Sequence, residues 1–60
     1  MFQPGTRVYD TLTNHEGITV SQEYAPDNGG IGLVVDVVSD KTGKRYTPPV
    51  RRLAVVSSLR

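Results

Sequence analysis

The fold is decided by the stretch Ser39-Asp40-Lys41-Thr42-Gly43-Lys44, which stands between two runs rich in apolar residues. Short polar side chains favour a type I turn, and a glycine that follows such a turn adopts the left-handed conformation that closes a β-hairpin. We therefore expect a strand on each side of this stretch, with Gly43 at the left-handed position.

The run before this turn, residues 31–39, carries apolar side chains on both faces of the strand that it predicts. A strand buried on both faces needs either a sheet that curls on itself, as in a barrel, or a second copy of the chain over its outer face. We expect this strand to be the central one. One face holds Leu33, Val35 and Val37, and the other holds Val34 and Val38 around Asp36. The candidate residues for an interface with a second copy are Ile31, Val34 and Val38.

The run after the turn, residues 44–47, should end at Pro48 and Pro49, because a proline nitrogen cannot donate to a sheet ladder. Residues 50–53 then fit one 3-10 turn, and residues 54–57 fit a last strand. A longer C-terminal helix is the alternative. Thr47 would cap such a helix, whereas the adjacent β-branched Val55 and Val56 favour the strand.

Two further strands are expected in the N-terminal half, over residues 7–12 and 17–24. The first run is short and mixed, whereas the second alternates between apolar and polar side chains, which is typical of a half-buried strand. The expected inward residues are Val8 and Leu12 in the first run and Ile18, Val20 and Tyr24 in the second, with Tyr9, Thr19, Ser21 and Glu23 facing outward.

Sixty residues with 37% hydrophobic content predict a single domain over residues 1–60, with a thin core and no enclosed catalytic cleft. Because cysteine is absent, neither a disulfide nor a thiolate zinc site can reinforce that core. No leader or membrane-spanning pattern is found, so we expect a cytoplasmic protein. The lone His15, expected at the tip of a turn, predicts neither a metal site nor a nucleophilic triad, and no cofactor is expected.

Charge is unevenly distributed along the chain, although the formal net charge is only +1. Residues 1–40 hold six carboxylates against one arginine, a net charge of −5, and residues 41–60 hold six basic residues and no acid, a net charge of +6. A basic C-terminal third is typical of a protein that binds an anionic partner such as nucleic acid or an acidic protein surface. Alternatively, acids and bases pair across the sheet. The candidate nucleic-acid-binding residues are Lys41, Lys44, Arg45, Tyr46, Arg51 and Arg52.

Five short strands, a hairpin between the third and the fourth, and one helical turn before the last together resemble the SH3-like small β-barrels, which include the KOW and Tudor groups. The segments Pro4-Gly5-Thr6-Arg7-Val8 and Gly30-Ile31-Gly32-Leu33-Val34 resemble the glycine-led strands of those groups. The resemblance covers residues 4–57 and implies an all-β, five-stranded barrel that acts as a binding module.

One enzyme family of that architecture, the trimethoprim-insensitive dihydrofolate reductases, has a turn that Pro49-Val50-Arg51-Arg52-Leu53 resembles. The sequence departs from that family just before the turn, where Tyr46-Thr47-Pro48 replaces the family's ligand-binding run. No catalytic residue is therefore carried over, and an enzymatic pore built from several copies is a third alternative. The sequence favours a non-catalytic module that binds nucleic acid, or else a protein-interaction or self-assembly module that acts as a homo-oligomer.

Overall fold

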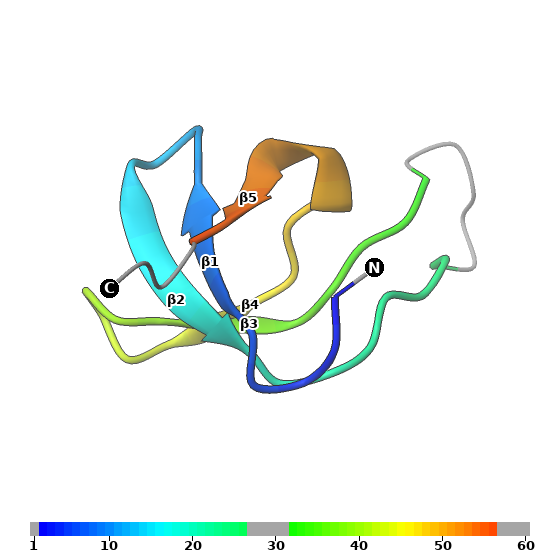
Figure 1. Cartoon of the computed structure of the whole chain (residues 1–60), viewed down its shortest axis with the longest axis horizontal. Coiled ribbons are helices and arrows are strands. Elements are labelled where there is room, and N and C mark those ends of the chain that lie inside the picture. Colours follow the sequence, from blue (N-terminus) through cyan, green and yellow to red (C-terminus); the bar gives the residue numbers. More distant parts are fainter. Residues whose placement is uncertain (1, 27–31, 57–60) are drawn as a thin grey trace.

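Turn-forming residues divide the chain into five short antiparallel strands and one 3-10 turn (Figure 1). The computed structural model describes residues 2–26 and 32–56. Its elements are β1 (Arg7–Asp10), β2 (His15–Thr19), β3 (Val37–Ser39), β4 (Arg45–Tyr46), the 3-10 turn η1 (Val50–Arg52) and β5 (Leu53–Val55). The all-β prediction with a 3-10 turn before the last strand is confirmed, and the alternative of a longer C-terminal helix is wrong.

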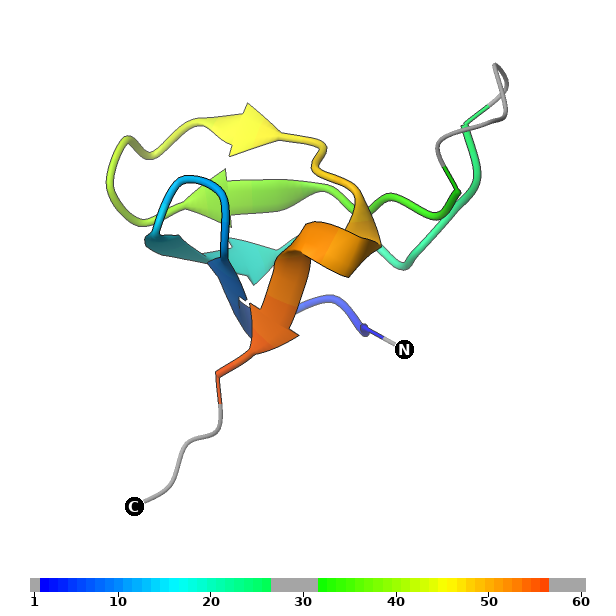
Figure 2. The same ribbon diagram turned by 90° about the horizontal axis from the view of Figure 1, so that it is seen from above.

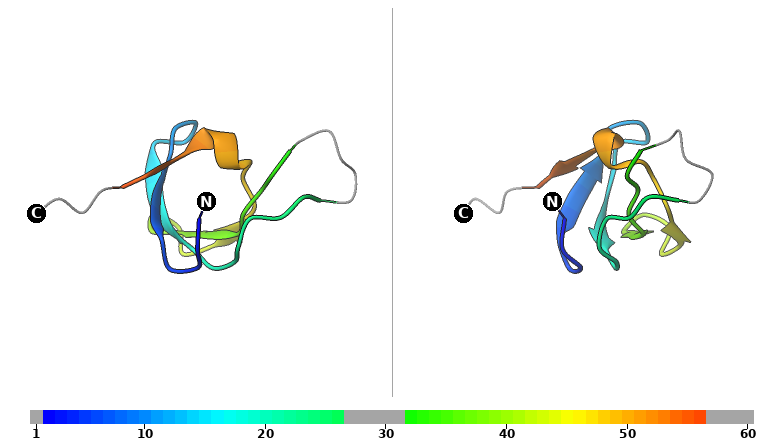
Figure 3. Two further views of the ribbon diagram at one scale, coloured as in Figure 1. Left: turned by 45° about the vertical axis from the view of Figure 1, so that its right-hand side comes forward. Right: turned by 90° about the vertical axis from the view of Figure 1, so that its right-hand side faces the viewer.

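The strands form one sheet in the order β4-β3-β2-β1-β5, so β2 is the central strand and the prediction that residues 31–39 form it is wrong. The sheet curves around the N-terminal segment, as the left view of Figure 3 shows. Strands β4 and β5 are its two edges, and the sheet is not closed.

The β3–β4 hairpin has the predicted geometry. The N–H of Gly43 donates to the Ser39 carbonyl at 2.8 Å, and the N–H of Ser39 donates to the Lys44 carbonyl at 3.0 Å. Gly43 has a φ of 74°, in the left-handed region that glycine enters without a steric penalty. The local turn chemistry is therefore sufficient to specify this hairpin.

The residues before β3 and after β4 also pair with each other, although the latter include Pro48 and Pro49. Val34 forms isolated bridges with Tyr24 and with Pro49. The carbonyl of Pro48 accepts the N–H of Val35 at 3.3 Å, because a proline that cannot donate can still accept. The prolines thus end β4 as a strand without separating the two segments.

The turn between β1 and β2 begins two residues earlier than predicted. The Asp10 carboxylate accepts the N–H of Leu12 at 3.0 Å, and the Asp10 carbonyl accepts the N–H of Asn14 at 2.8 Å. Leu12 lies in this turn with 67% of its surface exposed, so the prediction that it packs beside Val8 is wrong. His15 begins β2, which corrects its predicted place at the tip of the turn.

The faces of β2 are opposite to those predicted. Thr19 is buried, Ile18 is half-buried and Val20 is exposed. A Cβ atom on Gly17 would lie 2.6 Å from the Val38 carbonyl oxygen, so only a glycine fits against β3 at this register. The Thr19 hydroxyl accepts the N–H of Thr6 and donates to a backbone carbonyl, which satisfies it in the interior.

The core lies on the concave face of the sheet. Its buried members are Phe2, Val8, Val35 and Val37, and Tyr46, Val50 and Leu53 pack against them. Full burial of a valine or phenylalanine side chain contributes about 1.5–3 kcal/mol to the free energy of unfolding. A core with so few buried side chains therefore gives the domain only a small margin of stability. Among the described residues no helix is long and apolar enough to cross a membrane, and the cytoplasmic location stays a prediction.

Candidate functional site

A buried carboxylate, Asp10, gathers donors from several elements on the concave side of the sheet. It accepts hydrogen bonds from Arg52 Nη2 at 2.7 Å and Nε at 3.1 Å, and from the Tyr46 hydroxyl at 2.7 Å. The Arg52 bonds, followed by those of Tyr46 and of the Leu12 N–H, hold the pKa of Asp10 well below its usual range. Two of the predicted nucleic-acid-binding residues, Tyr46 and Arg52, are therefore engaged inside the domain.

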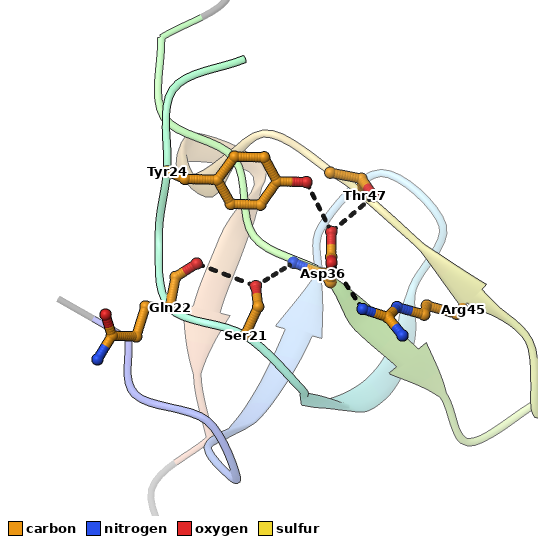
Figure 4. A network of polar contacts seen from close by, with 6 residues as sticks. All are labelled: Ser21, Gln22, Tyr24, Asp36, Arg45 and Thr47. Carbon is orange, nitrogen blue, oxygen red and sulfur yellow. Dashed lines mark hydrogen bonds and ion pairs between the residues drawn. The ribbon is translucent and has the colours of Figure 1, made fainter.

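A second carboxylate, Asp36, organises a polar network on the outer face (Figure 4). Its Oδ2 accepts from Arg45 Nη2 at 2.9 Å, and its Oδ1 accepts from the hydroxyls of Tyr24 and Thr47, each at 2.9 Å. The hydrogen bond from Arg45 is the largest cause of a lowered pKa at Asp36, and those from Thr47 and Tyr24 act in the same direction. The Ser21 hydroxyl fixes the backbone by accepting the Asp36 N–H at 3.1 Å.

This network joins the segment after β2 to β3 and β4, and its carboxylate is largely covered. The Asp36 side chain is 16% exposed, whereas that of Arg45 is 63% exposed. A carboxylate that already accepts three side-chain bonds has little capacity left for a cationic ligand. The network is therefore best understood as a brace that holds Tyr24 and Arg45 at the surface.

Two further ion pairs, both made by Arg7, link β1 with β2 and with the β3–β4 hairpin. Arg7 Nη1 lies 2.6 Å from Asp40 Oδ2 and 3.3 Å from Glu16 Oε1, with all three side chains substantially exposed. The alternative that acids and bases of the two parts of the chain pair is thus observed for Arg45 and Arg52, whereas Arg7 pairs with acids of its own part.

The remaining candidate cations lie at two separate places. Lys41 and Lys44 are exposed on the β3–β4 hairpin and form no ion pair with the described residues. Arg51 is exposed in η1. The hairpin tip and η1 lie well apart in Figures 1 and 2, so the structure does not bring the six predicted residues onto one surface.

The three candidate interface residues also have different environments. Val34 is only 4% exposed and is buried within the chain itself, Val38 is half-buried on the outer face, and Ile31 lies outside the described residues. Val38 stands directly opposite Ile18 in the β2–β3 register, and the N–H of Val20 donates to the neighbouring Asp36 carbonyl.

These contacts define an outer apolar patch, which consists of Ile18, Val20 and Val38. Sequence reasoning placed Ile18 and Val20 in the core, because alternation alone does not say which face is inward. The signal that identifies the outward face is Gly17, whose missing side chain allows β3 to approach on the concave side.

No pocket is formed by residues 2–26 and 32–56, and no group of three His, Asp or Glu residues among them could hold a metal ion. The tyrosines do not gather on one surface. Tyr46 reaches into the core, Tyr24 is exposed beside Asp36, and the Tyr9 hydroxyl donates to Asn14 at 2.5 Å. The available surface is therefore a sheet face rather than a cleft.

Comparison with protein-family models, with curated proteins and with solved structures finds no match to this chain. The candidate site therefore rests on its own geometry.

Proposed function

We propose that this chain is a small non-catalytic self-assembly module, built on an SH3-like barrel, that associates with a second copy through the outer apolar patch. Three features support the barrel assignment: the number of strands, the β3–β4 hairpin and the 3-10 turn before β5 resemble those of SH3-like barrels. Closure of the sheet into a barrel belongs to this proposal.

The observation that carries the proposal is the balance between buried and exposed apolar side chains. Among the described residues, five hydrophobic side chains are buried and five large ones are exposed. A single core of this size rarely stabilises a 60-residue domain by more than about 3–5 kcal/mol, and small domains commonly add stability by oligomerisation. The exposed set comprises Leu12, Val20, Tyr24, Leu33 and Val55.

The outer apolar patch has the composition expected of an interface. Its aliphatic centre is bordered on one side by the Arg7 ion pairs and on the other by the Arg45–Asp36 pair. Interfaces typically combine an apolar centre with a polar rim, and arginine and tyrosine are enriched among the residues that contribute most to binding. Tyr24, held beside Asp36, extends the patch at the Arg45 border.

The test is the molar mass in solution, measured by light-scattering chromatography over a range of protein concentrations. Val38→Lys places a charge at the centre of the patch and should abolish association through it. Leu12→Lys makes the same kind of change at a residue that is 67% exposed in the β1–β2 turn, and should leave the mass unchanged. Equal masses for Val38→Lys and the unmodified chain would contradict the proposal.

Nucleic-acid binding is a second candidate, supported by the two lysines of the β3–β4 hairpin. Lys41 and Lys44 form no ion pair with the described residues, and the nearby Arg45 side chain is 63% exposed. Three phosphate contacts would give a slope of log affinity against log salt of about −3 on duplex DNA. Asp36 and Asp40 offset part of this charge, so binding would be weak.

Titration of a short duplex at low and moderate salt tests this candidate with the double variant Lys41→Glu, Lys44→Glu. These residues make no ion pair that holds the described fold, so their replacement should remove binding without unfolding the domain. Arg52→Glu is unsuitable for this test, because it would place a second carboxylate beside the buried Asp10 and destabilise the fold. Undiminished affinity in the lysine variant would rule out the hairpin as the binding surface.

A further inference from the structure

The two edges of the sheet differ in how far they are protected against pairing with another strand. β4 has only two residues, one of them Arg45, and it is followed by Pro48 and Pro49. Charge, proline and short length are the usual means by which proteins protect an edge strand. β5 and the residue after it, Leu53-Ala54-Val55-Val56, contain no charge, proline or glycine.

The register of β5 on β1 determines which of its backbone groups face outward. The N–H of Val56 donates to the Arg7 carbonyl at 3.0 Å, and the N–H of Thr11 donates to the Arg52 carbonyl at 2.9 Å. Because the hydrogen-bonded pairs of an antiparallel ladder alternate, Ala54 also bonds to β1, whereas Val55 does not. Val55 lies opposite Val8 as a non-hydrogen-bonded pair.

The N–H and C=O of Val55 therefore point away from the sheet, and no described residue pairs with them. The Val55 side chain is 59% exposed, so this outward-facing position combines an apolar surface with a donor and an acceptor that no residue of 2–26 or 32–56 uses. An antiparallel strand could take both hydrogen bonds at this one residue.

We propose that the β5 edge is a second self-association site, at which β5 of another copy pairs antiparallel about a two-fold axis through Val55. The arrangement is self-complementary, because Val55 of each copy donates to and accepts from its equivalent. Ala54 then lies opposite Val56 of the other copy, and no like charges meet between residues 54 and 56. This site is separate from the outer apolar patch, and together the two contacts join more than two chains.

The experiment is the molar mass of four chains at high concentration: unmodified, Val38→Lys, Val55→Pro and the double variant. Val55→Pro removes the outward N–H and leaves the β1 ladder intact, since proline is tolerated on the exposed side of an edge strand. We expect the unmodified chain to exceed a dimer, each single variant to form a dimer through the remaining contact, and the double variant to be monomeric. Val55→Thr keeps the N–H and the branched shape, and should retain the mass of the unmodified chain.

The outcomes separate the two proposals. If the unmodified chain associates, a monomeric Val38→Lys variant, or a Val55→Pro variant with the mass of the unmodified chain, would overturn the edge proposal and leave the patch standing. A monomeric unmodified chain would overturn both proposals. A Val38→Lys variant with the mass of the unmodified chain would overturn the patch instead.

If Val55→Pro does not fold, amide hydrogen exchange on the unmodified chain decides the matter. The Val55 amide should exchange at least about tenfold more slowly at high than at low concentration, because pairing would protect it. Concentration-independent exchange at Val55 would overturn the edge proposal.

Discussion

Replacing the buried Asp10 by asparagine tests whether its ion pair with Arg52 stabilises the fold by holding η1 against β1. The Asp10 side chain is 1% exposed and accepts bonds from Arg52, Tyr46 and the N–H of Leu12. Asparagine preserves the size of the side chain but removes its charge and replaces one acceptor by a donor. The Arg52 guanidinium then loses its counter-ion.

The expected loss is large relative to the stability of the domain. Removing one partner of a buried ion pair costs about 3–5 kcal/mol, and a 60-residue domain has about 3–9 kcal/mol in total. The Arg52 side chain remains 28% exposed, so water can partly solvate it. We therefore expect the Asp10→Asn variant to lose about 3 kcal/mol, the lower end of that range.

Urea unfolding at low protein concentration measures this loss without a contribution from association. The matched control is Asp40→Asn, which removes the same charge from an exposed pair with Arg7 and should cost about 0–1 kcal/mol. If the two variants lose equal stability, the Asp10–Arg52 pair does not hold the fold and the reasoning fails.

The dependence of stability on pH gives a second measure of the same pair. The pKa of Asp10 is lowered in the folded state, chiefly by Arg52, so its contribution is present above the unfolded pKa of about 3.9 and is lost as the pH falls below it. Stability of the unmodified chain should therefore fall steeply in acid. The Asp10→Asn variant should show a flatter acid limb, to which Asp36 still contributes.

Two further predictions concern single residues of the interior. Burial and the bond to Asp10 raise the pKa of Tyr46 to about 12. The protonated hydroxyl should therefore stabilise the fold below about pH 10, and this contribution should be lost as the pH rises through 12. An ultraviolet titration of the unmodified chain should show a step near that pH that Tyr46→Phe abolishes. A titration of Tyr46→Phe identical to that of the unmodified chain would contradict this. Gly17→Ala should cost about 1–3 kcal/mol by overpacking against Val38, whereas Gly43→Ala has open space and should lose about 1 kcal/mol through its positive φ alone. Urea unfolding of both variants checks this order, and the reverse order would refute the register of β2 on β3.

Local chemistry allowed the C-terminal half to be predicted from the sequence. Gly43 closes the hairpin, Pro48 ends β4, and the residues that follow form one 3-10 turn, each through interactions within a few positions of the chain. Turn signals also located β1 and β2, but alternation in the second run placed Ile18 inward and the buried Thr19 outward. The inward face is set by contacts with β3, which no local pattern contains.

The candidate site was harder to predict because it depends on which strands become neighbours. The basic third of the sequence suggested a continuous anionic-partner surface. Arg52 instead meets Asp10, 42 residues away in sequence, and Arg45 meets Asp36 across the β3–β4 hairpin. The alternative of charge pairing between the two parts of the chain describes Arg45 and Arg52, and the exposed lysines follow from their place in the hairpin turn.

Charge segregation along a chain therefore says little about charge at the surface when the topology mixes its two halves. The order β4-β3-β2-β1-β5 places β1 beside β5 and brings the acidic first two thirds into contact with the basic last third. Ion pairs engage Arg7, Arg45 and Arg52, and the surfaces that we propose for recognition are carried mainly by Lys41 and Lys44 of the hairpin and by the aliphatic residues of the outer face. A substitution at Arg52 should consequently report on folding, whereas one at Lys41 or Val38 tests the binding that we propose, and the choice of variant decides which property an experiment measures.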